Sequence, residues 1–189
     1  GKQELIFKKT GLQVDPYFSA TKIAWVLDNV PEARQKAEKG DLLFGTIDTF
    51  LLWQLAGEHK TDVTNASRTM LYNINSREWD EDLLKLFNIP KTILPQVEES
   101  SHEFGQHKDT KIKITGIIGD QQAALFGQQC FSMNSMKATF GTGCFLMANT
   151  GSEPKYSNQG LLTTIGYGVS NTTAYALEGS IFSCGTIVK

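Results

Sequence analysis

Apolar side chains near the start of the chain recur every three or four residues in two segments. Residues 4–9 and residues 19–27 both show this spacing, which predicts amphipathic helices. Gly11 is expected to end the first helix, and Ser19 is the expected N-cap of the second. The chain should therefore open with two helices that each bury one face.

The next stretch predicts helices packed on a sheet. A polar helix is expected over residues 31–39, because it starts at a proline and Gly40 follows it. Residues 42–45 are apolar and predict a short strand. Asp48 should then begin a strongly apolar helix over residues 49–55.

Two later segments also predict helices. Asp80 is the expected N-cap of a helix over residues 83–87. Strict alternation over residues 111–115 predicts a strand, and the helix-forming residues 121–126 follow it closely. The glycines between them allow a tight strand-to-helix turn.

The pattern changes after Gln128, where strands replace helices. Residues 136–140 and 144–148 predict two short strands joined by a glycine-rich turn, and residues 161–167 and 172–177 predict two more. The expected product is a β-meander that leads into the start of a helix.

This change predicts a domain boundary. Residues 1–128 would form the later part of a first lobe, and residues 129–189 the opening part of a second. A ligand cleft is expected between the two lobes, where binding sites commonly lie.

Composition restricts the partners. The 189 residues include 18 basic and 20 acidic ones, a net charge of -2, so there is no electrostatic case for binding nucleic acid or an anionic membrane. Apolar runs such as residues 50–53 are too short to cross a bilayer, so a cytoplasmic location is expected. Because the chain opens on Gly1 and stops just after Gly185 introduces another apolar segment, it is interpreted as a fragment of a larger protein.

Cysteine and histidine do not predict a metal site. Cys130, Cys144 and Cys184 are widely separated, so each is expected to be a buried apolar side chain. The three histidines, at positions 59, 102 and 107, lie in polar segments and are expected on the solvated surface.

Asp120 is the first candidate for chemistry, at the corner between the strand and helix predicted around Gly119. One interpretation is that its carboxylate only caps the helix by accepting backbone N–H bonds. The alternative is a general base at the carboxyl end of a strand, where open α/β sheets bind ligands. These residues alone leave both interpretations open.

Gly141-Thr142-Gly143 is the second candidate. It lies between strands, so it is neither a Walker A loop nor a dinucleotide fingerprint, both of which need a strand-to-helix context. It could be an ordinary hairpin turn. It could also let backbone N–H groups and the Thr142 hydroxyl approach a phosphate closely.

Six short segments spread over nearly the whole chain carry a resemblance to a known family. They are residues 15–25, 64–71, 119–128, 140–145, 161–165 and 175–179. Together they resemble the FGGY carbohydrate kinase family, and most closely its members that phosphorylate glycerol. The resemblance implies an α/β fold of the actin/hexokinase-like (ribonuclease H-like) type, a two-lobed ATPase fold that would be incomplete at both ends here.

The resemblance also implies roles for individual residues. Asp120 would be the catalytic base that accepts the proton of the attacking glycerol hydroxyl, and Tyr17, Gln121 and Phe145 would contact glycerol with it. The ATP-binding residues would be Gly141, Thr142, Gly143 and Gly185.

Further parts of the machinery are implied elsewhere. ATP and Mg²⁺ are the implied cofactors, but the acidic residue that assists Mg²⁺ and an Arg-Glu pair that grips glycerol would lie upstream of Gly1. Most of the adenine pocket would lie beyond Lys189, and residues 186–189 depart from the family's usual helix start. Residues 106–110 are shorter than the loop with which some members bind fructose 1,6-bisphosphate, so this regulation is not expected.

Two rival functions remain. One is another family kinase that acts on a pentulose or a different polyol. The other is a non-catalytic, actin-like nucleotide-binding module, although it would not explain why Tyr17, Gln121 and Phe145 accompany Asp120. The resemblance further implies a homo-oligomer for the full-length protein.

Overall fold

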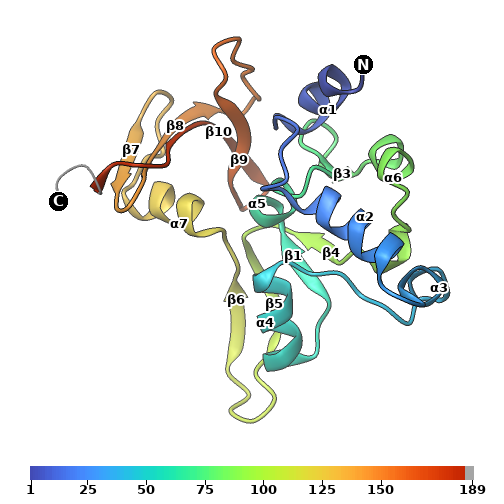
Figure 1. Cartoon of the computed structure of the whole chain (residues 1–189). Helices are drawn as coiled ribbons and strands as arrows, with labels where there is room; N and C mark the ends of the chain where they lie inside the picture. The colour runs from blue at the N-terminus through green and yellow to red at the C-terminus, as the bar shows by residue number, and fades with distance from the viewer. Residues whose placement is uncertain (186–189) are drawn as a thin grey trace.

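The computed structural model describes residues 1–185 of the chain. Helices with short strands make up one side of the molecule, and a four-stranded antiparallel sheet makes up the other (Figure 1). Helices α5 (Val63–Ala66) and α7 (Asp120–Gly127) both contact strand β9 (Leu162–Val169) and so connect the two sides. None of the described helices is long and apolar enough to cross a membrane.

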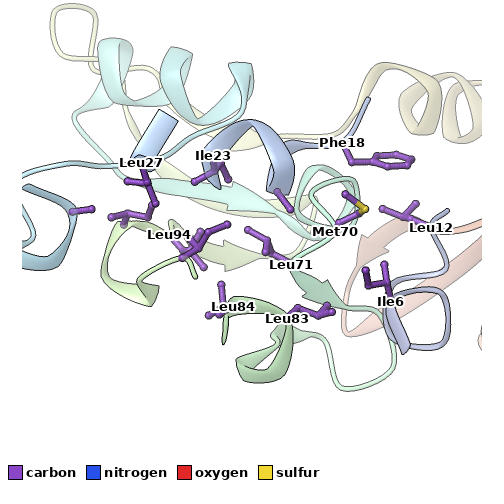
Figure 2. Packing of buried hydrophobic residues seen from close by; sticks show 14 of the residues in the cluster. Ile6, Leu12, Phe18, Ile23, Leu27, Met70, Leu71, Leu83, Leu84 and Leu94 are labelled. Carbon is purple, nitrogen blue, oxygen red and sulfur yellow. The ribbon is translucent and has the colours of Figure 1, made fainter. Parts of the chain in front are cut away.

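Four helices surround the largest apolar core: α1 (Gln3–Thr10), α2 (Ser19–Asn29), α3 (Ala33–Lys39) and α6 (Glu81–Phe87). Figure 2 shows Ile6, Ile23, Leu27, Leu83 and Leu84 meeting in this core. All five are less than a tenth exposed. The helical periodicity therefore identified Ile23 and Leu27 correctly, whereas Trp25 and Val26 of the same helix are 62% and 40% exposed.

Gly11 ends α1 as predicted. Its φ of 72° lies in the left-handed region that glycine tolerates, and its N–H donates to the carbonyl of Phe7. A Cβ on Gly11 would lie 2.2 Å from the carbonyl oxygen of Thr163 in strand β9. This close approach fixes α1 against the opposite side of the molecule.

Several predicted helix starts were wrong by one or two residues. Ser19 is the first residue of α2, and Phe18 occupies the N-cap without a side-chain cap. The polar helix α3 begins at Ala33, because Glu32 at its N-cap adopts a left-handed φ of 64°. Gly40 ends it as predicted.

The strand predicted over residues 42–45 is absent from the described structure. These residues are extended, and the N–H of Phe44 donates to the carbonyl of Ile93 (2.8 Å), but no ladder forms there. The apolar helix that follows is α4 (Ile47–Ala56), with Thr46 at its N-cap. Asp48 therefore lies in the first turn rather than before it.

A parallel strand pair and a short helix form the centre of the helical side. They are β1 (Lys60–Asp62), β4 (Gln96–Glu98) and α5 (Val63–Ala66). Asp62 ends β1 and caps α5 by accepting the N–H groups of Thr64 and Asn65. The remaining short elements are β2 (Tyr72–Asn73), β3 (Glu78–Trp79), the 3-10 turn η1 (Lys91–Ile93), β5 (Ser101–Gln106) and β6 (Lys113–Gly116).

The four strands after residue 128 were predicted correctly, but the meander order was wrong. Helix α7 (Asp120–Gly127) leads into β7 (Met136–Phe140), β8 (Cys144–Gly151), β9 (Leu162–Val169) and β10 (Thr172–Ile181), in the sheet order β7-β8-β10-β9. Strand β10 therefore lies between β8 and β9 and pairs antiparallel with both. Ile165 and Tyr175 of this sheet pack with Val63, Ala66 and Tyr72 in a second core, which holds the sheet against the helical side. The helix start predicted after the meander lies outside the described residues.

The burial predicted for cysteine and histidine was partly wrong. Cys130 and Cys144 are buried, but Cys184 is only half-buried, because it lies beside the hairpin that follows β7. His59 is half-buried, and its ring Nε2 lies 2.7 Å from the carbonyl oxygen of Phe44. His102 and His107 are also half-buried rather than fully solvated.

Asp80 caps α6 as predicted and also forms an ion pair. Its carboxylate accepts the N–H groups of Asp82 and Leu83 and the ammonium group of Lys9 at 2.8 Å. Burial acts to raise the pKa of the Asp80 carboxyl, but hydrogen bonds from Lys9, Asn73 and the Leu83 backbone outweigh it. The pKa therefore lies below its ordinary value of 3.8.

We expect the substitution Asp80→Ala to lower the free energy of unfolding by about 1–2 kcal/mol at neutral pH, measured by urea titration. Because folding lowers this pKa, the stabilisation is complete above the unfolded-state pKa and is lost as the pH falls through the folded-state value. The difference between Asp80→Ala and wild type should therefore shrink below about pH 4. Asp82→Ala is the matched control, since Asp82 is 65% exposed and should have a small effect. If the difference in unfolding free energy between Asp80→Ala and wild type did not change with pH, this explanation would be wrong.

Candidate active site

Asp120 lies at the strand-to-helix corner, as the sequence predicted, but it is not the N-cap. Gly119 occupies the N-cap, and Asp120 is the first residue of α7. Its carboxylate accepts the N–H of Gln121 at 2.7 Å, and the residue is exposed. A carboxylate at a helix N-terminus is also stabilised by the helix dipole. Asp120 therefore contributes to the first turn of α7 while remaining accessible to a ligand.

A chain of hydrogen bonds fixes the position of this corner. The N–H of Gly119 donates to the hydroxyl of Thr64 (2.9 Å), which donates in turn to the carboxylate of Asp62 (2.7 Å). Ser100 also donates to Asp62. Burial raises the pKa of Asp62, although the hydrogen bonds that it accepts act in the opposite direction. A Cβ on Gly119 would lie 2.7 Å from the amide oxygen of Gln122, so a larger residue there would require the Gln122 side chain to shift.

A cleft of about 730 Å³ opens beside Asp120. It brings together all four residues for which substrate contact was predicted, namely Tyr17, Asp120, Gln121 and Phe145. They come from the loop before α2, the start of α7 and strand β8. The other lining residues are Ser19, Lys22, Thr46, Ile47, Asp48, Leu51, Asn65, Arg68, Ile118, Gly119, Gln122 and Glu178. The cleft combines aromatic and aliphatic surface with several polar groups, as small-molecule sites usually do.

The four predicted nucleotide residues form a second group. Gly141, Thr142 and Gly143 make the turn between β7 and β8, and the N–H of Gly141 donates to the carbonyl of Gly143 (2.8 Å). The N–H of Gly185 donates to the carbonyls of Gly141 (3.1 Å) and Thr142 (3.2 Å). A Cβ on Gly185 would lie 2.5 Å from the Gly141 carbonyl oxygen. The absence of side chains at this crossing therefore allows the two backbones to touch.

The two groups are joined through strands β7 and β8. Phe145 follows the hairpin directly and pairs with Thr139 across the two strands. A Cβ on Gly143 would lie 3.4 Å from the ring of Phe145 and 2.7 Å from the carbonyl oxygen of Ile181. The hairpin therefore continues into the wall of the cleft that contains Asp120.

Sequence reasoning assigned no role to an ion pair that lines the cleft. The guanidinium of Arg68 donates to both carboxylate oxygens of Glu178 at 2.7 and 3.1 Å. The Glu178 side chain is only 4% exposed, and Arg68 also lies over the ring of Phe18 at 5.3 Å. Both residues lie within segments that carried the family resemblance. The sequence signal that could have identified this pair was Glu178 itself, a charged residue in a largely apolar strand.

Lys137 is a third residue that the sequence did not single out. It lies in β7 and is 1% exposed, whereas its strand neighbours Met136 and Phe140 are 60% and 73% exposed. The ammonium group donates to the side-chain oxygen of Gln121 and to the hydroxyl of Thr139. The strand therefore buries a lysine and exposes two apolar side chains, which is the reverse of the usual arrangement.

The described residues contain no group of three or more His, Cys, Asp or Glu side chains that could hold a metal ion. Two carboxylates that line the cleft have partners within the chain. Glu178 accepts from Arg68, and Asp48 accepts the hydroxyl of Thr61 at 2.7 Å.

Comparisons with known proteins match this geometry. The model of the FGGY family of carbohydrate kinases, N-terminal domain, matches residues 1–127. The whole chain is 55% identical to the glycerol kinase of Gluconobacter oxydans (strain 621H) and 56% identical to that of Limosilactobacillus reuteri (strain DSM 20016). It covers 38% and 39% of these two proteins. The crystal structure of Plasmodium falciparum glycerol kinase with ADP matches with a TM-score of 0.94 and 44% identity, over 98% of this chain and 39% of that one.

The fold and the cleft thus define an α/β chain of the actin/hexokinase-like class, which confirms the predicted fold class. The chain belongs to the FGGY family of carbohydrate kinases. It spans about two fifths of the length of the curated relatives that it matches.

Proposed function

We propose that this chain is part of a longer kinase that transfers a phosphoryl group from ATP to glycerol. One observation carries the proposal: Asp120, Gln121, Tyr17 and Phe145 line a single cleft whose wall continues into the glycine hairpin. The identity of more than half to glycerol kinases over the whole chain supports glycerol as the acceptor.

Asp120 would act as the base. A glycerol hydroxyl would donate its hydrogen bond to the exposed carboxylate and transfer its proton as it attacks the phosphorus. Phosphoryl transfer passes through a loose transition state, so a carboxylate is basic enough to accept the proton late. The Thr64 and Gly119 hydrogen bond would keep the base in position throughout.

Tyr17 and Phe145 would contact the carbon backbone of the polyol. Tyr17 is 64% exposed and packs its ring edge-on against Phe18 at 5.4 Å, so it forms one wall of the cleft. Phe145, which is half-buried, would form a second wall. Apolar walls would also exclude water from the transferred group.

The hairpin would hold the phosphates of ATP. Backbone N–H groups around Thr142, together with its hydroxyl, can approach a phosphate because the flanking glycines carry no side chain. Gly185 would let the nucleotide lie against the backbone, because its N–H already donates to the hairpin carbonyls and it carries no side chain. Mg²⁺ usually keeps several waters and binds one or two carboxylates together with phosphates, so it would be held with an acidic residue elsewhere in the longer protein, as the family resemblance implies. Such a reaction, which consumes ATP, would be cytoplasmic.

Two features support a longer protein with two lobes. Helix α4 exposes Ile47, Phe50 and Leu51, which are each more than half exposed, and such an apolar face usually packs against another segment. The family model for the N-terminal domain matches residues 1–127, which supports placing the lobe boundary between residues 128 and 129. The second lobe would then begin with the four-stranded antiparallel sheet.

A panel of polyols and ketoses tests the function. The longer enzyme should release ADP in a coupled assay with glycerol as the preferred acceptor, and the isolated 189-residue chain should be inactive because part of the phosphate site is missing. A preference for xylulose over glycerol would favour a pentulose kinase instead. ATP binding without any acceptor-dependent turnover would favour a non-catalytic nucleotide-binding module.

A further inference from the structure

Lys137 is a buried charge that the proposed chemistry does not use. Its side chain extends from β7 toward the start of α7, where its ammonium group donates to Gln121 Oε1 and to Thr139 Oγ1 (2.9 Å). Neither partner carries a charge. Burial lowers the pKa of Lys137, while the nearby carboxylates of Glu178 and Asp120 act to raise it. Burying an ammonium group among neutral partners costs free energy, and buried charged groups of this kind often lie at functional sites.

The contact with Lys137 determines how Gln121 presents its amide. An amide side chain has an oxygen that accepts and an NH₂ group that donates, whereas an ammonium group can only donate. Lys137 must therefore contact the oxygen. The charge-assisted bond holds that end of the amide, and the NH₂ end remains for a ligand in the cleft that Gln121 lines.

The result is a pair of complementary groups at the start of α7. The Asp120 carboxylate can only accept a hydrogen bond, and the NH₂ group of Gln121 can only donate one. Two hydroxyls of one polyol match this pair, because one can donate to Asp120 while the oxygen of the other accepts from Gln121. Thr139, the second partner of Lys137, pairs with Phe145 across β7 and β8, so the lysine also contacts the strand pair that supplies the aromatic wall.

We propose that Lys137 is a positioning residue that sets acceptor specificity by holding the Gln121 amide with its NH₂ group toward the substrate. This rests on the proposed function in one respect, namely that a polyol occupies the cleft. Lys137 does not touch the polyol itself.

The first test compares Lys137→Met with wild type in the longer enzyme. Methionine keeps much of the side-chain length but cannot donate a hydrogen bond. We expect the KM for glycerol to rise about tenfold, the effect of one misplaced hydrogen bond, while kcat changes less than about threefold. The preference for glycerol over 1,2-propanediol and 1,3-propanediol should fall by a similar factor. Lys155→Met, at a lysine whose side chain is 56% exposed on the same side of the molecule, is the matched control and should leave all values unchanged.

A double-mutant cycle tests whether Lys137 acts through Gln121. If it does, Gln121→Leu and the double variant Lys137→Met/Gln121→Leu should have the same glycerol KM, because the second change removes nothing further. Additive effects would overturn the proposal. A fall in kcat at unchanged KM would also overturn it, since that result would place Lys137 on the transferred group.

A second variant covers the case in which Lys137→Met does not fold. Gln121→Glu keeps a partner for the buried ammonium group but removes the NH₂ donor, so the enzyme should fold and its glycerol KM should rise at least tenfold. An unchanged KM would overturn the proposal. If wild type instead prefers a ketose, the proposed function fails, and the same cycle with that ketose decides the coupling between Lys137 and Gln121 separately.

Discussion

Replacing Asp120 with asparagine in the longer enzyme should reduce kcat by about 10²- to 10⁴-fold. Asparagine has the same shape and keeps an oxygen that can accept the N–H of Gln121, but an amide cannot take the proton of the attacking hydroxyl. The hairpin around Thr142 is a separate group of residues, so ATP binding should remain measurable. The variant thus separates chemistry from nucleotide binding.

Steady-state turnover from a coupled ADP assay and ATP binding by titration calorimetry would measure the two effects. Asp109→Asn is the matched control, because Asp109 is an exposed aspartate on the turn before β6 and lies outside the residues that line the cleft. Its kcat should equal that of wild type. If Asp120→Asn also kept the wild-type kcat, Asp120 would not be the base.

The second large effect should come from the ion pair between Arg68 and Glu178. Arg68→Met would leave the Glu178 carboxylate, which is 4% exposed, without its charged partner. Breaking a buried pair in this way costs about 3–5 kcal/mol, because the remaining charge is neither solvated nor neutralised. We therefore expect Arg68→Met to lower the free energy of unfolding strongly and to disturb the cleft that both residues line.

The double variant Arg68→Met/Glu178→Gln provides the internal test. It removes both charges, so it should be less destabilised than Arg68→Met alone in urea titrations. The control is the exposed pair between Lys91 and Glu81, whose side chains are 60% and 61% exposed and whose loss should cost about 0–1 kcal/mol. Equal destabilisation of the single and double variants would show that the buried charge is not the cause.

Local signals predicted those parts of the fold whose stabilising contacts lie close together in sequence. The helix that Asp80 caps and the left-handed glycine that ends α1 depend on bonds within one helical turn. The hairpin at residues 141–143 depends on glycines within the turn itself. The strand expected over residues 42–45 failed, because a strand also needs a partner, and the segment found only one carbonyl, that of Ile93.

The candidate site also combines residues that could be found from the sequence with residues that only the fold brings together. The family resemblance drew attention to Asp120, Gln121 and Thr142, and the structure brings Asp120 and Gln121 into one cleft. The family resemblance gave no role to Arg68, whose partner Glu178 is 110 residues away along the chain. No local pattern can state which distant carboxylate an arginine will meet.

Strand β7 shows what the sequence by itself determined and what the tertiary structure decided. A strand over residues 136–140, which the sequence predicted, places Lys137 on the face opposite that of Met136 and Phe140. The sequence could not tell which face would be buried, and hydrophobicity favoured the wrong one. The tertiary structure buried Lys137, because α7 packs beside β7 and presents the Gln121 amide oxygen to the ammonium group. The alternation of side chains follows from the backbone geometry of a strand. Which face is buried depends on the element that packs against the strand, here α7 with the polar side chain of Gln121.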